Sequence, residues 1–248
     1  MSAKHPASSS SLPPVDWHNV RPIYKKLSDE FSVLTDPYKI VMTKEQKLKL
    51  DHLILSIDVV DQYIDEMPHK EERDLLTTSI KESLRQKGTI WSHPLASAKL
   101  EKNITILKQI VQDLGIQSRF AKAASRIFRY TEEKRHTPHR KALIQLVQKE
   151  GYATSELPLA VMQVSPDHPF AGFFSRLCML MGIADLIVDA RSDYRTKYIV
   201  ARPSPLLYFH LVGIVLYEGL RLIWQFPYKI SFLLYCIRFS FALLWDKD

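Results

Sequence analysis

The chain has 248 residues, of which 46% are hydrophobic, and it carries a formal net charge of +7. This length supports one sizeable hydrophobic core and is too short for several. The two cysteines, Cys178 and Cys236, lie in apolar runs, which argues against a disulfide framework and a cysteine metal site. Only 7 glycines occur, and apolar residues recur every three or four positions, so we predict an all-α protein.

The first 20 residues are expected to form a disordered leader. They contain the serine run 8–11 and the pair Pro13 and Pro14, and they lack the apolar centre of a secretory signal. A single helical domain is expected over residues 21–248. The positive charge fits nucleic acid, an anionic membrane surface or a phosphorylated substrate. No nucleic-acid fold signature accompanies it, so we expect no nucleic acid and predict a cytoplasmic protein, with the membrane surface as the alternative location.

Helical spacing of apolar residues predicts a series of helices separated by proline and glycine. Pro68 ends the first helix and Gly115 the third, while Gly151 is predicted to cap the fifth. A turn-rich segment that includes Pro158 is expected to follow. The predicted helices cover residues 47–66, 70–86, 96–114, 118–135, 140–150 and 170–193.

The last section contains two apolar stretches, 205–226 and 228–245, which Pro227 separates. A membrane-spanning helix needs about 20 mostly apolar residues, and charged side chains such as Glu218 and Arg238 interrupt both stretches. We therefore expect buried or interfacial helices, which either roof a cavity or hold the protein against a membrane.

Two widely separated triplets of aspartates lie in otherwise apolar helical stretches. Spacings of three and four place each triplet along one face of a helix, because a helix turns about 100° per residue. Two such faces turned toward each other would gather the oxygen ligands that magnesium prefers. The alternative is that each triplet marks a solvated helix face. The triplets are Asp58, Asp61 and Asp65 in the first predicted helix, and Asp185, Asp189 and Asp193 in the sixth.

The residues before the second triplet predict an apolar wall. Phe174, Cys178 and Met181 precede Asp185 along the same helical line, and Ile54 has a similar position before the first triplet. This pattern describes a hydrocarbon pocket with a charged mouth. Because magnesium leaves coordination positions to substrate phosphates and water, a lipid-like diphosphate is the expected substrate.

The second triplet lies in a segment that resembles a known motif. Residues 182–194, GIADLIVDARSDY, resemble the second aspartate-rich motif of squalene and phytoene synthases, in which acids recur every four residues. Residues 57–65, IDVVDQYID, are similar to the first motif of that family. Lys197 and Tyr198 stand where the family commonly has a basic or aromatic residue near its phosphate site.

The resemblance implies a class I isoprenoid synthase fold, a helical bundle whose central apolar cavity holds a prenyl chain. Gln62 and Val188 depart from the squalene synthase pattern, which has an acid and an arginine there, so cyclisation and coupling both stay open. The family's aspartates bridge Mg²⁺ to the diphosphate. The residues that this implies as catalytic and metal-binding are Asp58, Asp61, Asp185, Asp189 and Asp193, with Asp65 as a further metal ligand.

Other residues are candidates for binding the substrate. Arg191, Arg195 and Lys197 could bind diphosphate oxygens, although cations are also common at a solvated helix end. Phe170 and Phe174 could line the cavity, with ordinary core packing as the alternative. Tyr198 completes this set through the resemblance.

Two functions follow from these observations. The first is a magnesium-dependent terpene synthase or prenyltransferase that ionises a prenyl diphosphate and then cyclises or couples it. The second is a non-catalytic, membrane-associated binding or assembly factor that retains the fold.

Overall fold

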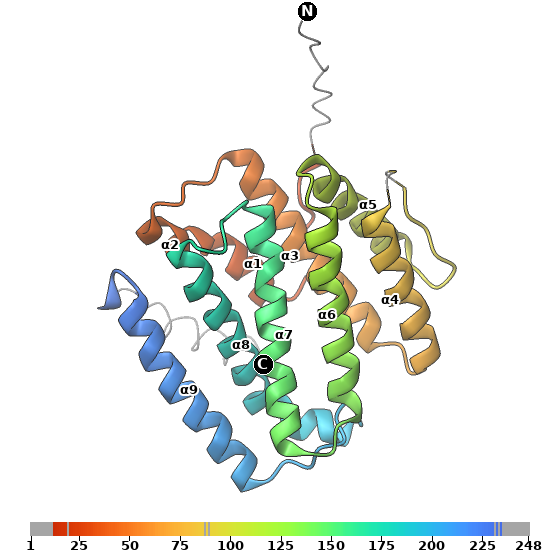
Figure 1. Cartoon of the computed structure of the whole chain (residues 1–248). Helices are drawn as coiled ribbons and strands as arrows, with labels where there is room; N and C mark the ends of the chain where they lie inside the picture. Colours follow the sequence, from red (N-terminus) through yellow and green to blue (C-terminus); the bar gives the residue numbers. More distant parts are fainter. Residues whose placement is uncertain are drawn as a thin grey trace, which may run out of the picture.

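The computed structural model describes residues 12–18, 20–86, 88, 90–230, 232 and 234, and every regular element in these ranges is helical (Figure 1). The all-α prediction is confirmed for this part of the chain. The elements are α1 (Pro22–Asp29), α2 (Phe31–Thr35), the short 3₁₀ turn η1 (Asp36–Tyr38), α3 (Lys44–Asp65), α4 (Lys70–Arg85), α5 (Ala98–Asp113), α6 (Gln117–His136), α7 (Arg140–Val161), α8 (Pro169–Arg195) and α9 (Pro205–Gln225).

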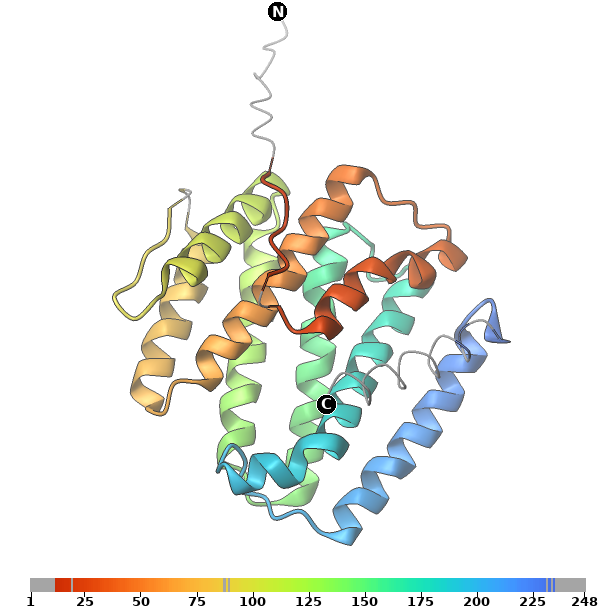
Figure 2. The ribbon, with the colours of Figure 1, turned by 180° about the vertical axis from the view of Figure 1, so that it is seen from behind.

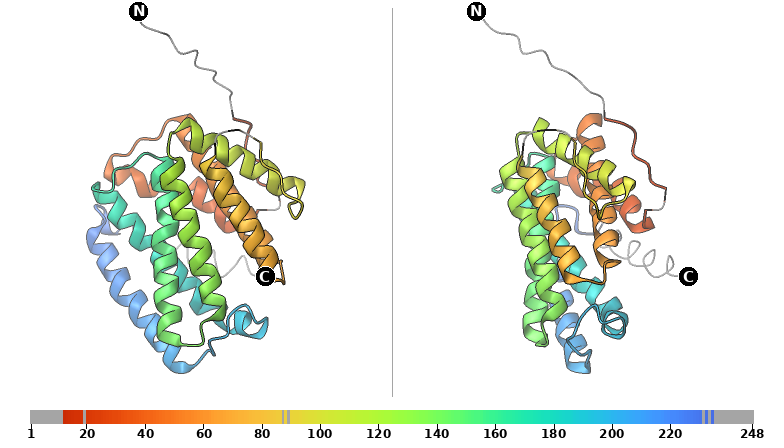
Figure 3. Two further views of the ribbon diagram at one scale, coloured as in Figure 1. Left: turned by 45° about the vertical axis from the view of Figure 1, so that its right-hand side comes forward. Right: turned by 90° about the vertical axis from the view of Figure 1, so that its right-hand side faces the viewer.

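Helices α6, α7, α8 and α9 are successive antiparallel neighbours, with α9 at the edge of the molecule (Figure 1). Helix α4 packs against α6, and α3 packs against α1, α5 and α7. Edge-on, α6 and α7 form one layer, with α3, α4 and α5 on one side of it (Figure 3). From behind, α1 lies between α3 and α8 (Figure 2). The two helices that carry the aspartate triplets therefore flank α1.

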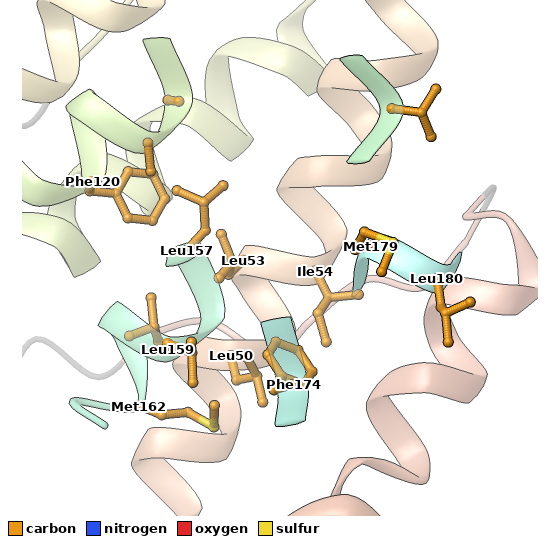
Figure 4. Packing of buried hydrophobic residues seen from close by; sticks show 14 of the residues in the cluster. Leu50, Leu53, Ile54, Phe120, Leu157, Leu159, Met162, Phe174, Met179 and Leu180 are labelled. Carbon is orange, nitrogen blue, oxygen red and sulfur yellow. The ribbon is translucent and has the colours of Figure 1, made fainter. Parts of the chain in front are cut away.

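The core lies between these layers. Leu50 and Leu53 from α3 meet Phe120 from α6, Leu157 from α7 and Phe174 from α8, and all five are buried (Figure 4). Burial of a large apolar side chain contributes about 1.5–3 kcal/mol, so residues far apart in sequence hold the bundle together.

Local signals explain where several helices begin and end. Thr43 starts α3 with a capping box, in which its hydroxyl accepts from the Gln46 backbone N–H and the Gln46 side chain accepts from the Thr43 N–H. Ser97 caps α5 and Ser204 caps α9, each through a side-chain oxygen that accepts one hydrogen bond from a backbone N–H of the first turn. Gly115 has a φ of 67°, which favours glycine, and it follows the end of α5 as predicted.

The predicted end of the fifth helix at residue 150 is wrong. Helix α7 continues to Val161, and Gly151 lies inside it, where a Cβ atom would stand 2.5 Å from the Met179 Cα. The glycine is there because the backbones of α7 and α8 approach closely. Pro158, predicted to lie in a turn, is also inside α7. The position of a glycine in the sequence does not by itself distinguish a helix cap from a close contact between two helices.

The expected leader boundary at residue 20 also differs from the structure. The carbonyl oxygen of Pro13 lies 2.8 Å from His52 Nε2, and Val15 and Trp17 pack against the core. The short helices α1 and α2, which follow this segment, were not predicted. Residues 1–11 and 19, Cys236 and the predicted helix beyond residue 234 lie outside the described residues.

Two described helices, α8 and α9, are long and apolar enough to cross a membrane. Helix α8 is the more buried of the two, because it packs against both α7 and α9. Its apolar character is explained by its place inside the bundle, whereas that of α9 is explained only in part.

Candidate functional site

The second triplet lies on the C-terminal half of α8. Asp185 is exposed and Asp193 is half-buried. Among the described residues, no hydrogen bond or ion pair reaches the carboxyl group of either one. Asp185 and Asp193 therefore present negative charge that no ion pair with a described residue neutralises.

Both of these carboxyls have strongly raised pKa values. Burial first, and then the charge of Asp189, raises the pKa of Asp185 to about 6. The pKa of Asp193 rises to about 6 for the same reasons, with Asp185 adding to the effect. Asp185 is accessible to solvent, yet the protein atoms around it desolvate its carboxyl enough to raise its pKa. Mutual repulsion between neighbouring carboxylates is relieved by protons or by a bound cation.

The first triplet has a different environment, which begins with Asp58. This side chain is fully buried in α3. Its Oδ1 accepts a hydrogen bond of 2.5 Å from Arg21 Nε. Its Oδ2 accepts from the Arg21 backbone N–H at 3.3 Å and from Gln62 Nε2 at 2.9 Å. Both oxygens of Asp58 are thus occupied by the protein itself.

Arg21 also binds the next acid of the triplet. Its Nη2 donates to Asp61 at 2.6 Å, and its guanidinium lies 4.8 Å from the centre of the Tyr24 ring. Burial alone would lower the pKa of Arg21, but Tyr24 and Asp61 outweigh it and raise the pKa. The residue before α1 therefore supplies a permanent cation to the first two acids of α3.

Asp65, the last acid of α3, has a separate partner. Arg135 Nη2 on α6 contacts its carboxylate at 2.7 Å, and the Arg135 guanidinium lies 4.2 Å from the centre of the Tyr198 ring. Burial and the charge of Asp61 raise the pKa of Asp65 to about 6, while Arg135 and Tyr198 act in the opposite direction. Each acid of the first triplet thus has an arginine beside it.

The two triplets act on each other across the space beside α1. Asp61 raises the pKa of Asp185, and Asp65 raises the pKa of Asp193. Lys134 opposes the rise at both residues of α8, and its ammonium is ion-paired with Glu150 of α7. Acids of α3 thus add to the raised pKa values of acids on α8, behind burial and Asp189. We use the name acid site for the six aspartates together with Arg21, Lys134 and Arg135.

The predicted substrate residues do not all lie at the acid site. Tyr198 does, through Arg135. Arg191, Arg195 and Lys197 are exposed at the end of α8 and in the turn after it.

Phe170 and Phe174 lie in an aromatic part of the core. Phe170 packs against Tyr38 with ring centroids 5.4 Å apart, and Phe174 packs against Phe31 at the same distance. Fifteen residues separate Phe170 from Asp185, which is about 22 Å along a helix. Their observed role is core packing.

The basic residues of the acid site were missed, although one of them left a signal in the sequence. Arg135 follows Ala124 by 11 positions and Phe128 by 7, which places all three on one helix face. Its burial was therefore predictable from the helix register, even though it lies in a run of charged residues. Arg21 stands alone in a segment without periodicity, and nothing in the sequence connects it with α3.

The acid site contains the type of ligand that binds metal ions, but its side chains do not form a complete coordination site. Carboxylate oxygens are what Mg²⁺ prefers, but no group of three metal-ligating side chains is already in place among the described residues. Such a site fits an ion that needs only one or two protein carboxylates and completes its shell with phosphate and water. Asp185, Asp189 and Asp193 are the residues that would hold it.

Two cavities among the described residues lie elsewhere. One is an open groove of about 1120 Å³ between α4, α6 and α7, whose lining includes Lys81, Lys122 and Lys149. The other, of about 140 Å³, lies between the N-terminal segment, α3 and α5. Neither is lined by the aspartate triplets.

Comparisons with known proteins give no relative for this chain. No family model matches it, and no significant match is found among curated proteins or among solved structures.

Proposed function

We propose that the protein is a magnesium-dependent enzyme of the class I isoprenoid synthase type, which ionises a prenyl diphosphate and then cyclises or couples the product. The observation that carries the proposal is the raised pKa of Asp185 and Asp193, which burial and the charge of Asp189 mainly cause and to which Asp61 and Asp65 of α3 add. An interaction between the two aspartate motifs is what the resemblance to squalene and phytoene synthases implies.

The metal would be held by the three aspartates of α8. Bound Mg²⁺ would supply positive charge to the diphosphate and so favour its departure. The carboxylates must be ionised for this role, and pKa values of about 6 at Asp185 and Asp193 leave both ionised above neutral pH.

The basic residues of the acid site would bind the diphosphate and orient it. Arg21 and Arg135 are held by Asp58 and Asp65, which fixes the guanidinium groups before a ligand arrives. Lys134 is held by Glu150 in the same way. Preorganised cations stabilise a leaving diphosphate better than mobile ones because the protein does not reorganise as the bond breaks.

The hydrocarbon chain would lie along α8 on the N-terminal side of Asp185. Cys178 and Met181 are partly accessible there, in contrast to the buried Phe174 one turn earlier. Burial raises the pKa of the Cys178 thiol to about 12, so the thiol stays neutral and behaves as an apolar group. An apolar wall would keep water from an allylic cation.

The test is to incubate the purified protein with magnesium and geranyl, farnesyl or geranylgeranyl diphosphate, and to analyse the extract by gas chromatography with mass spectrometry. We expect a new hydrocarbon or alcohol that Asp189→Ala does not form. The matched control is Asp113→Ala, an exposed aspartate at the end of α5, which should keep the activity. No product from any substrate, or equal product from Asp189→Ala, would reject the enzyme.

A second candidate function has one observation in its favour. Arg21 and Arg135 form ion pairs with all three acids of α3, whereas the carboxyls of Asp185 and Asp193 on α8 form none among the described residues. A binding or assembly factor that retains the fold would have the same arrangement. Thermal stability with magnesium and a non-hydrolysable prenyl diphosphate analogue tests both candidates, because a ligand bound by the native state raises its stability. A shift without turnover favours the second candidate.

A further inference from the structure

The outer face of α9 is apolar and exposed over the whole helix. At about 100° per residue, its large side chains lie within one stripe about as wide as a quarter of the helix circumference. No charged residue falls within that stripe. We call it the α9 face, and its residues are Leu206, Phe209, Leu216, Tyr217, Leu220 and Trp224.

These side chains are not a poorly covered part of the core. Phe209 is 75% exposed and Trp224 is 74% exposed, whereas Leu207, Leu211 and Leu222 on the other side of α9 are buried against the bundle. Helix α9 is therefore apolar both on the side that packs against the bundle and on the side that is exposed. Large contiguous apolar patches on a protein surface mark interaction sites.

The charges beside the α9 face all have one sign. Arg221 and Lys229 are exposed next to it, and the Lys229 ammonium lies 4.2 Å from the centre of the Trp224 ring. Glu218, the single acid of α9, is on the inward side, 3.8 Å from Arg176. Aromatic rings with apolar side chains below them and basic groups at their edge match the polar boundary of an anionic bilayer.

The apolar surface continues beyond α9. Tyr228, Ile230 and Leu234 are exposed, and residues 231–245 contain Arg238 as their only charged residue. We propose that the α9 face lies in the interface of an anionic lipid bilayer, parallel to its plane, and holds the protein at the membrane surface. The helix does not cross the bilayer in this arrangement, since its inner side stays packed on α8 (Figure 1).

This inference is independent of the proposed function, because it rests on no residue of the acid site. It adds a source for the substrate, since prenyl diphosphates are amphiphiles that partition into membranes. A negative enzyme assay would not contradict the membrane contact, and a negative vesicle-binding assay would not contradict the proposed enzyme.

The experiment is vesicle flotation of the full-length protein with phosphatidylcholine alone and with phosphatidylcholine mixed with phosphatidylglycerol. We expect binding to the mixed vesicles, and weaker binding at high salt because salt screens the lysine and arginine contacts. The double variant Leu216→Glu/Leu220→Glu should lower the affinity about tenfold or more, since both side chains would leave the acyl boundary. Binding that depends on neither salt nor these two residues would contradict the proposal.

The matched control is Leu75→Glu. Leu75 on α4 is 62% exposed, as Leu216 is, and it lies outside the α9 face. It should bind vesicles as the unmodified chain does. Trp224→Ala serves as a second variant should the double variant fold poorly, with circular dichroism as the check. It should weaken binding as well.

Two other occupants of the α9 face are outcomes that would overturn the proposal. If a second copy covers the face, light scattering without lipid shows a dimer that Leu216→Glu/Leu220→Glu converts to a monomer, and vesicles do not bind. If the chain covers the face with its own residues 235–248, the double variant lowers the melting temperature and the unmodified protein again does not bind vesicles.

Discussion

The two aspartate triplets have nearly the same spacing, yet the fold treats them differently. On α3, Arg21 and Arg135 bind all three acids, and Asp58 is fully buried. On α8, the carboxyls of Asp185 and Asp193 form no ion pair or hydrogen bond with any described residue. The acids of α3 hold two arginines in place, whereas Asp185 and Asp193 of α8 present carboxyl groups that a cation could bind.

The difference shows that carboxylate function depends on the neighbours that the fold supplies. Removing one partner of a buried carboxylate–arginine pair destabilises the fold because it leaves an uncompensated charge, whereas crowded carboxylates without such partners destabilise it until a proton or cation binds. The α3 triplet should therefore respond to mutation mainly in stability, and the α8 triplet mainly in ligand binding and turnover.

The largest effect is expected from Asp185→Asn. Loss of one charge-stabilising group in an active site commonly lowers the rate about 100-fold or more, and we expect that loss here. The measurement is product formation from the prenyl diphosphate that the unmodified protein accepts, with helical content as the check on folding. Full turnover by Asp185→Asn would show that Asp185 has no role in catalysis and that the two triplets do not differ in the proposed way.

Arg21→Ala should lower the free energy of unfolding by about 2–3 kcal/mol. The figure is below the range for a fully buried pair, because Arg21 is half-exposed and water can reach the uncompensated Asp58 after its removal. Urea unfolding measures it. The double variant Arg21→Ala/Asp58→Asn should recover part of the loss, since it leaves no buried unpaired charge and the remaining Asp61 is accessible to water. If the double variant loses as much free energy of unfolding as the two single variants together, Arg21 and Asp58 are not coupled.

Gly151→Ala should lower the free energy of unfolding by about 1–3 kcal/mol, because its Cβ would meet the α8 backbone. The separation of α7 from α8 sets where the second triplet stands relative to the first. Gly172→Ala is the matched control: this helical glycine has nothing within 4 Å of a Cβ, so alanine should stabilise α8 by about 0.5–1 kcal/mol. A neutral Gly151→Ala would show that the helices can move apart freely.

The smallest expected effect is the change of stability with pH. Its sign should differ between the α3 and α8 triplets. Because the pKa of Asp185 is about 6 in the folded protein and 3.8 ordinarily, the folded state holds this proton more tightly between these pH values. Its contribution to stability therefore falls as the pH rises from 4 to 6. Asp185→Asn should be slightly more stable than the unmodified protein at pH 7.5, and thermal melts with and without magnesium check this.

Magnesium should restore the lost stability at pH 7.5 and have little effect at pH 5, where protons already occupy the carboxyls of Asp185 and Asp193. Asp58→Asn is the contrasting variant, and it should be less stable than the unmodified protein at pH 7.5. The same sign for Asp58→Asn and Asp185→Asn would mean that the two triplets do not differ.

Much of the helical framework could be predicted from the sequence. The predicted bounds of α3, α4, α5, α6, α8 and α9 agree with the structure within about three residues, because periodic apolar faces and flanking prolines and glycines act locally. Helices α1 and α2 are too short to leave a periodic pattern. Gly151 and Pro158 are typical of helix ends in general, and the close approach of α8 that explains Gly151 is not a local property.

The sequence by itself determined the helical class, the six aspartates and the apolar character of α8 and α9, because these depend on residue type and spacing along one helix. Tertiary structure decided that Arg21 and Arg135 reach the first triplet, that Phe170 and Phe174 pack in the core, and that no described residue covers the α9 face. The physical reason is that charge pairing and burial depend on which segments meet in space. Arg21 and Asp58 are 37 residues apart, and local spacing carries no record of their contact.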